Sequence, residues 1–285
     1  MKRAHIFLQL IANLVFGMII LKLVSEYMKY GNITIDIGAW GVFYTVFGVL
    51  YAIIIGFTIT GGSYETDMDV PADLGGGINV LSSNLTLSDL HITGNTGYIG
   101  GGVYVDANSS MNLSNSLVDY NTAASSGGGL SVAGVVTFDS VDVLYNNGGN
   151  SGGIHLYYAQ GEISNSRISY NEGTFNSPGL YIHGVLSDEE GEPGLILNHV
   201  EISNNIGDHQ VNIISSSSSS TTNIVELNNV TIVADPETPS LVSGIHISGQ
   251  ISNTVGIHNS IIGTFPLGGI LTDDNENVTI DYSNI

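Results

Sequence analysis

Hydrophobic and polar residues alternate along most of the chain in short runs, and these runs recur at a nearly constant interval. One motif reads apolar-x-apolar, a two-residue bend that contains Asp or Asn, apolar-x-apolar, and then Asn. Because alternation with a period of two is typical of strands, each copy predicts two short strands joined by a bend. Complete copies occupy 85–95, 111–121, 136–146, 161–171 and 195–205, weaker copies occupy 225–235 and 255–265, and partial copies occupy 52–62 and 278–285.

A second motif, a glycine followed by an apolar-x-apolar strand, recurs at the same interval, and each unit lacks the periodicity of a helix. Units of this size cannot bury an apolar face alone, but a parallel stack of them can. We therefore predict an all-β fold, a right-handed single-stranded parallel β-helix of about nine rungs over residues 52–285. At a strand spacing of roughly 4.8 Å it would be about 43 Å long. The glycines are Gly77, Gly102, Gly129, Gly153, Gly179, Gly244 and Gly269.

Aligned copies place residues of one kind in columns along the predicted axis. The Asn that closes each copy is expected to form a hydrogen-bonded ladder along the axis, continued by Asp235. A second column, at the bend between the two strands of each copy, contains mostly residue types that are common in turns. We expect the glycines to adopt positive φ at a sharp corner. The ladder contains Asn95, Asn121, Asn146, Asn171 and Asn205, and the bend column contains Asp89, Asn115, Ser140, Asn165, His199, Asn229 and Asn259.

The first 51 residues differ from the repeat. A basic start at 1–3 and an apolar stretch at 6–21 are typical of a signal peptide or an uncleaved signal-anchor helix, with a buried core helix as the alternative. Ile33, Ile35 and Ile37 alternate with polar residues before a second apolar run. We expect a hydrophobic helix in 1–30, a β-rich cap or a second membrane segment in 31–51, and the repeat domain in 52–285.

Charge restricts the partners. Four of the five Lys and Arg residues lie in the first 29 positions, and 25 of the 26 Asp and Glu residues follow Tyr30. Such an acidic surface repels nucleic acids and anionic lipids, so we expect no nucleic-acid partner and membrane contact only through the N-terminal segment. The chain has no cysteine, which excludes disulfides and thiolate metal sites.

The stretch 55–62 (IGFTITGG), the repeated Gly-Gly-Gly-apolar elements and the Ile-Ser-x-Asn elements carry a family resemblance. The chain resembles bacterial surface and secreted proteins with right-handed β-helix repeats of the pectin-lyase-like superfamily. These include envelope-anchored or type IX-secreted proteins and, more distantly, chlamydial polymorphic outer membrane proteins. The resemblance covers about 52–285 and implies a location outside the cell or in the bacterial envelope, whereas the first 50 residues and the end in mid-rung depart from it.

The same superfamily includes polysaccharide lyases and galacturonidases, so an enzyme is the main alternative. Lyases of this type use Arg or Lys as base, and only Arg167 lies in the repeat domain; the Gly-His-Gly and Arg-x-Lys strings of galacturonidases are missing. Outward positions of the strands after the glycines instead predict a strip of aromatic, histidine and acidic side chains. This strip is our candidate glycan-binding site, and its His and Tyr members are candidate acid–base groups for the alternative. Its residues are Tyr104, Asp106, His155, Tyr157, Tyr181 and His183, with His155, Tyr157, Tyr181 and His183 as the catalytic candidates.

One acidic loop is a candidate metal site. Asp188, Glu189, Glu190 and Glu192 offer only oxygen ligands, which suits weak Ca²⁺ binding rather than a transition metal. The loop lacks the spacing of an EF-hand, and a solvated loop is the alternative. No other cofactor is expected.

Together these features predict a non-enzymatic extracellular or cell-surface β-helix, either an adhesin or stalk or a module that contacts a polysaccharide or surface glycan. The alternatives are a polysaccharide-active enzyme that uses the strip and a structural fragment of a larger secreted protein.

Overall fold

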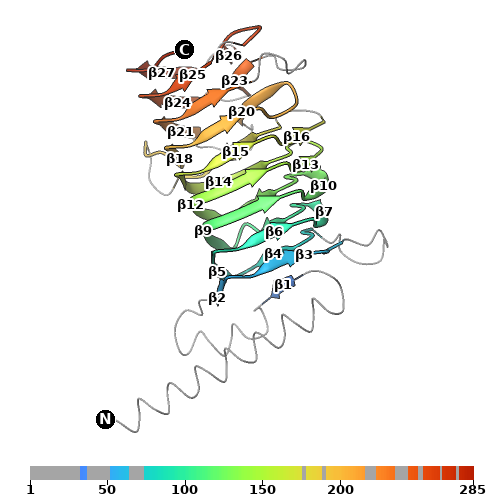
Figure 1. Cartoon of the computed structure of the whole chain (residues 1–285). Coiled ribbons are helices and arrows are strands. Elements are labelled where there is room, and N and C mark those ends of the chain that lie inside the picture. The colour runs from blue at the N-terminus through green and yellow to red at the C-terminus, as the bar shows by residue number, and fades with distance from the viewer. Residues whose placement is uncertain are drawn as a thin grey trace, which may run out of the picture.

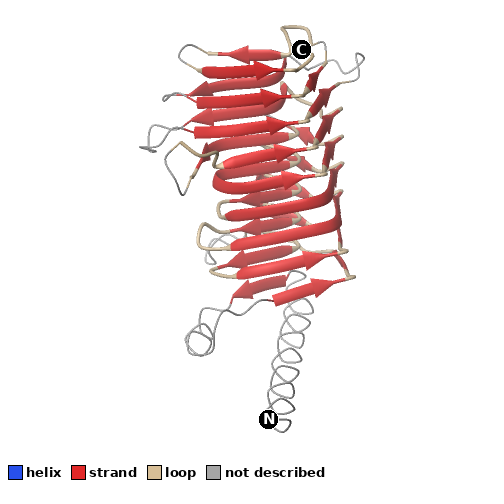
Figure 2. Ribbon diagram, turned by 90° about the vertical axis from the view of Figure 1, so that its left-hand side faces the viewer, coloured by secondary structure: helices blue, strands red, loops and turns tan. Residues whose placement is uncertain are grey.

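The protein is an all-β parallel solenoid in which short strands stack in layers along one axis (Figures 1 and 2). The computed structural model describes residues 33–36, 52–63, 74–174, 178–187, 191–215, 223–234, 243–249, 253–263, 265–273 and 276–285. These residues form about seven turns of the solenoid, whereas the sequence predicts about nine rungs. The predicted repeat and its parallel stacking are confirmed.

One face, sheet A, is built from the strands that follow the glycines. Each strand pairs in parallel with the equivalent strand of the next coil, for example Leu130 with Ile154 and Ile154 with Leu180. Since every strand has a neighbour one coil away, sheet A runs along the described solenoid. Its strands are β1 (Ile33–Asp36), β4 (Ile78–Leu81), β8 (Val103–Val105), β11 (Leu130–Val132), the first part of β14 (Ile154–Ser164), β17 (Leu180–Val185), β20 (His209–Ser215), β23 (Ser243–Gly249) and β26 (Ile270–Thr272).

The bent motif of the sequence forms sheet B, and a smaller sheet C lies between the two larger ones along the chain. Strands of sheet B also pair in parallel from coil to coil. Sheet B contains β2 (Ala52–Ile55), β3 (Thr58–Thr60), β5 (Asn84–Ser88), β6 (His91–Thr93), β9 (Ser110–Asp119), β12 (Val135–Leu144), the second part of β14, β15 (Arg167–Ser169), β18 (Leu195–Asn198), β19 (Glu201–Ser203), β21 (Asn223–Asn228), β22 (Thr231–Val233), β24 (Asn253–His258), β25 (Ile261–Ile262) and β27 (Asn277–Asp281). Sheet C contains β7 (Thr96–Ile99), β10 (Thr122–Ser126), β13 (Asn147–Gly148) and β16 (Glu172–Gly173).

The bend in sheet B is a column of residues in the left-handed backbone region. All seven residues predicted for the bend, from Asp89 to Asn259, have φ between 47° and 60°. Short polar side chains tolerate this conformation better than bulky ones, so the column of Asp, Asn and Ser in the sequence follows from the backbone. The prediction of this bend is confirmed.

The asparagine ladder is also confirmed. The side-chain amide of Asn95 donates to the Oδ1 atom of Asn121 over 2.9 Å, and the same contact measures 3.0 Å from Asn121 to Asn146. Equivalent bonds of 3.0 Å continue to Asn171 and Asn205. The ladder then passes to the Oε1 atom of Gln210, at 2.7 Å, a residue that the sequence pattern did not indicate. The predicted continuation, Asp235, lies outside the described residues.

The role predicted for the glycine column was wrong. None of the seven glycines has positive φ; within the same turns, positive φ occurs at Gly100 and Gly127 instead. Glycine is required because there is no space for a side chain. A Cβ atom on Gly102 would lie 2.7 Å from the carbonyl oxygen of Gly129 and 3.0 Å from the side-chain amide nitrogen of Asn121. The glycine column therefore packs directly against the next coil and the ladder.

The interior is a single apolar core along the axis. Side chains from sheets A and B fill it at exposures of 5% or less, and Phe138, which is 0% exposed, is among its largest members. A continuous core of this kind stabilises coils that could not fold alone.

Most of the N-terminal predictions lie outside the described residues. Only β1 is described there, and Ile33 pairs in parallel with Ile78, so this strand belongs to the first coil. The helix expected in 1–30 and the rest of the segment 31–51 stay predictions. Within the described ranges, no helix has both the length and the apolar character that a membrane crossing requires.

Candidate functional site

The predicted strip lies on the outer face of sheet A, where one column of side chains continues from coil to coil. Register places Tyr104, Ser131, His155, Tyr181 and Asn212 in this column. Although these side chains point away from the core, most of them are buried. Two glycine-rich turns fold back over the outer face. Before β4, the backbone of Gly75 exchanges two hydrogen bonds with the Asn79 amide, and before β11 a Cβ atom on Gly127 would lie 3.0 Å from the Cβ atom of Ser131.

His155 and Tyr181 form the buried part of the strip. Their rings stack at a centroid distance of 5.1 Å and 12°, and their exposures are 9% and 7%. Neither ring nitrogen of His155 has a hydrogen-bond partner. Burial, and secondarily the nearby His183, lower the pKa of His155 to about 4, so His155 is neutral at neutral pH. Strand alternation predicts that these two side chains point outward, and they do, but they are buried on the outer face.

Tyr157 and His183 form the more exposed part of the strip, and together with the neighbouring Tyr158, which was not predicted, we call them the aromatic patch; Tyr157 is exposed, and the other two are half-buried. Tyr157 is 44% exposed and stands in register with His183, with ring centroids 5.1 Å apart and an angle of 87°. The Tyr158 ring contacts Tyr157 edge to face at 4.7 Å and lies over Gly184, where a Cβ atom would approach the ring to 2.7 Å. Burial lowers the pKa of His183. The patch therefore presents aromatic rings to solvent on a rigid, close-packed base.

Tyr104 and Asp106 are separated from the patch. Ser131 lies between Tyr104 and His155 in the column, and burial with the nearby Asp106 raises the pKa of Tyr104. The Asp106 carboxylate accepts backbone hydrogen bonds from Ser82, at 3.1 and 3.2 Å, and from Asn108, at 3.1 Å. These bonds fix the turn after β8, so Asp106 stabilises the local backbone.

The predicted calcium loop is only partly described. Glu192 is exposed, whereas Asp188, Glu189 and Glu190 lie outside the described residues. In the part of the chain that the structure describes, no three His, Asp or Glu side chains gather in a metal-binding arrangement. The calcium site stays a prediction.

A second aromatic feature, on a bend outside sheet A, was missed by the sequence analysis. Tyr120, Tyr145 and Tyr170 stack with centroid distances of 5.2 and 5.0 Å and angles of 6° and 10°. They are 61%, 45% and 43% exposed, and we call them the tyrosine ladder. A signal existed: each tyrosine directly precedes a ladder asparagine, and the interval between them is 25 residues.

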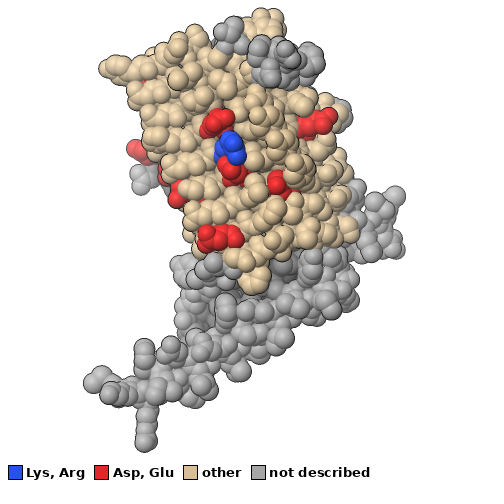
Figure 3. Space-filling model, in the orientation of Figure 1, with Lys and Arg blue, Asp and Glu red and all other residues tan. Residues whose placement is uncertain are grey.

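The bend of sheet B forms a shallow polar groove with a volume of about 620 Å³. Asp89, His91, Asn115, Asp142 and Asn165 are among the residues that line it. Arg167 donates to Asp142 at 2.9 Å beside the groove. Figure 3 shows this face, where the one basic side chain of the described residues is surrounded by acidic ones. Since the pair is exposed, it contributes little to stability.

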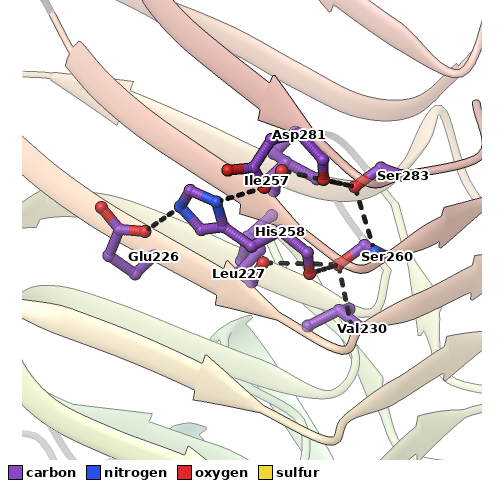
Figure 4. Close-up of polar contacts among 8 residues, drawn as sticks. All are labelled: Glu226, Leu227, Val230, Ile257, His258, Ser260, Asp281 and Ser283. Atoms are coloured by element: carbon purple, nitrogen blue, oxygen red, sulfur yellow. Dashed lines mark hydrogen bonds and ion pairs between the residues drawn. The ribbon is translucent and has the colours of Figure 1, made fainter.

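A histidine between two carboxylates connects three successive coils near the C-terminus (Figure 4). The Nδ1 atom of His258 lies 2.6 Å from Asp281, and its Nε2 atom lies 2.8 Å from Glu226. Both nitrogens face acceptors, so the imidazolium form satisfies both contacts. The hydrogen bond to Asp281 is the main cause that raises the pKa of His258, with Glu226 adding to it.

This cluster predicts a pH-dependent stability. Because the folded state raises the pKa of His258 above the unfolded value of about 6.5, its stabilisation is complete below that value and is lost as the pH rises through the folded pKa. We expect the melting temperature to fall as the pH rises above about 6.5, and to fall less in His258→Gln. This range also avoids protonation of His155 and His209, whose pKa values are lowered to about 4. Thermal unfolding of both proteins, with the exposed His199→Asn as control, measures the difference; parallel curves for wild type and His258→Gln would contradict it.

The arrangement of these side chains on sheet A suits contact with a ligand better than proton transfer to or from one. Of the four catalytic candidates, His155 and Tyr181 are buried, and His155 makes no hydrogen bond to an acid or base. Tyr157 and His183 remain accessible, and their rings are suited to stacking on a ligand. Comparisons with protein-family models, with curated proteins and with solved structures found no match to this chain.

Proposed function

We propose that this protein is a non-enzymatic β-helix outside the cell or at its surface that contacts neutral glycans through the aromatic patch. The observation that carries the proposal is the exposure of Tyr157 in edge-to-face contact with Tyr158 and His183, above the buried His155–Tyr181 stack. Tyrosine rings stack well on the C–H faces of sugars, and a rigid base lowers the entropic cost of ordering them on binding.

The charge of the chain supports a neutral ligand. The net charge is −21, and the described residues contain one basic side chain, Arg167. An acidic polysaccharide would be repelled by this surface, whereas an uncharged one would not.

The alternative of a polysaccharide-active enzyme receives less support from the geometry. A general acid at neutral pH requires a proton near the substrate, but His155 is buried with its pKa lowered to about 4. The parallel stack, the asparagine ladder and the family resemblance support a right-handed β-helix of the pectin-lyase-like type, preceded by an N-terminal hydrophobic helix. That helix would hold the protein in the envelope, as expected of an adhesin or stalk. Labelling of intact cells with a membrane-impermeant reagent tests this location.

Binding of the full chain, in detergent micelles, to arrayed neutral and acidic glycans tests the glycan contact. We expect binding to neutral glycans, weakened about fivefold in Tyr157→Ala because each lost aromatic contact removes on the order of 1 kcal/mol. Tyr282→Ala is the matched control, since Tyr282 is 90% exposed on the last coil. Wild-type affinity in Tyr157→Ala would contradict the proposal. Release of shorter sugars that stops in His155→Ala or His183→Ala would favour the enzyme.

A further inference from the structure

The tyrosine ladder ends beside two glycines. The bend position before each ladder level is occupied, from coil to coil, by Gly61, Gly94, Tyr120, Tyr145, Tyr170 and Asn204. All six residues adopt left-handed φ, between 51° and 77°. Along the axis, the column thus changes from two glycines, which have no side-chain heavy atoms, to a stack of three tyrosine rings.

The backbone does not explain why tyrosine occupies three of these positions. Left-handed φ favours glycine and asparagine, and a bulky residue adopts it at a cost. Gly94 and Asn204 show that the same column accepts the favoured residues. Burial in the core does not explain the tyrosines either, since each is more than 40% exposed. Both observations point to a role at the surface.

The two ends of the stack differ in their neighbours. Tyr145 lies between two rings, and at one end Asn204 follows Tyr170 and its amide donates a hydrogen bond to the Tyr170 hydroxyl at 3.3 Å. Tyr120 has Tyr145 on one side and Gly94 on the other, and it is the most exposed of the three, at 61%. Its face toward Gly94 therefore contacts no other ring.

Gly94 leaves a notch beside that face. A Cβ atom on Gly94 would meet only the Thr60 hydroxyl oxygen, at 3.3 Å. One coil, at roughly 4.8 Å along the axis, gives the notch the depth of about one ring.

We propose that the free face of Tyr120 and the notch over Gly94 bind one ring of a neutral sugar. The pyranose would stack on Tyr120 as a fourth ring, where the ladder itself spaces rings 5.0 to 5.2 Å apart. Asp119, next to Tyr120, pairs with His91 at 2.8 Å and disfavours an anionic sugar. The inference rests on the proposed function for its class of ligand, but its site is separate from the aromatic patch.

Two substitutions test the notch from opposite directions. Tyr120→Ala removes the stacking face, and Gly94→Tyr fills the notch with a protein ring at a φ of 65°, close to the 51° to 58° of the three tyrosines. Full-length protein is titrated calorimetrically with cello-, manno-, xylo- and chitohexaose, after circular dichroism and thermal melting establish that each variant is folded. We expect both variants to weaken binding of at least one hexaose about tenfold and Tyr282→Ala to leave it unchanged.

The titrations separate the two sites. Wild-type affinity in both Tyr120→Ala and Gly94→Tyr, with a loss in Tyr157→Ala, would overturn the notch and support the patch. A loss in the first two variants with wild-type affinity in Tyr157→Ala would support the notch and contradict the patch. Tighter binding of tetramethylammonium than of any hexaose would overturn the assignment to sugars, since a cation also stacks on tyrosine.

Discussion

Replacing Asn146 by alanine is expected to lower the free energy of unfolding by about 4 kcal/mol. Its Oδ1 atom accepts from the backbone N–H of Asn121 at 2.9 Å, and its amide donates to the carbonyl of Val118 at 2.9 Å and to Asn171 at 3.0 Å. The substitution leaves these buried groups without partners, and each one costs about 1–3 kcal/mol. Urea unfolding followed by circular dichroism measures the change.

Asn147→Ala is the matched control, because the neighbouring Asn147 side chain is exposed. A change of no more than about 0.5 kcal/mol is expected there. If both substitutions gave equally small effects, the ladder would not stabilise the stack as the hydrogen bonds suggest.

Replacing Phe138 by alanine is expected to cost about 3–5 kcal/mol, since deletion of a buried aromatic ring leaves a cavity in addition to the lost burial. Phe138 is fully buried and lies in register with Leu113 and Ile163 of the adjacent coils. The coils on both sides are held by the rest of the sheet, so they have little freedom to collapse into the space.

Phe57→Ala serves as the control for this variant, because Phe57 is 57% exposed. Chemical denaturation of both variants should give a large loss for Phe138 and a small one for Phe57. A Phe138→Ala protein as stable as the wild type would mean that the interior is loosely packed.

The features predicted best are those that repeat. Strand alternation, the bend column at Asp89 and its equivalents, and the asparagine ladder follow from side-chain type at a fixed interval. A parallel stack brings equivalent residues of successive coils into register. The change from Asn to Gln210 at the end of the ladder was not predictable, because Gln210 reaches Asn205 from five residues away rather than from the next coil.

The candidate site was predicted only in part. Alternation placed His155, Tyr157, Tyr181 and His183 on the outer face, as found, but did not separate the buried pair from the exposed one. That separation depends on the burial of the stacked His155 and Tyr181 rings, which is a tertiary feature. The tyrosine ladder was visible as Tyr-Asn at intervals of 25 residues, yet its stacking required the left-handed bends.

By itself the sequence determined the parallel stack, its apolar interior and its polar columns, since hydrophobic alternation and the interval between copies leave one way to bury a shared face. Only the tertiary structure decided which outward side chains meet solvent, why the glycine column needs space rather than positive φ, and where an aromatic face stays open. These properties depend on how closely one coil approaches the next and on how the turns fold over the sheets. The pattern of residues along a single coil contains neither kind of information.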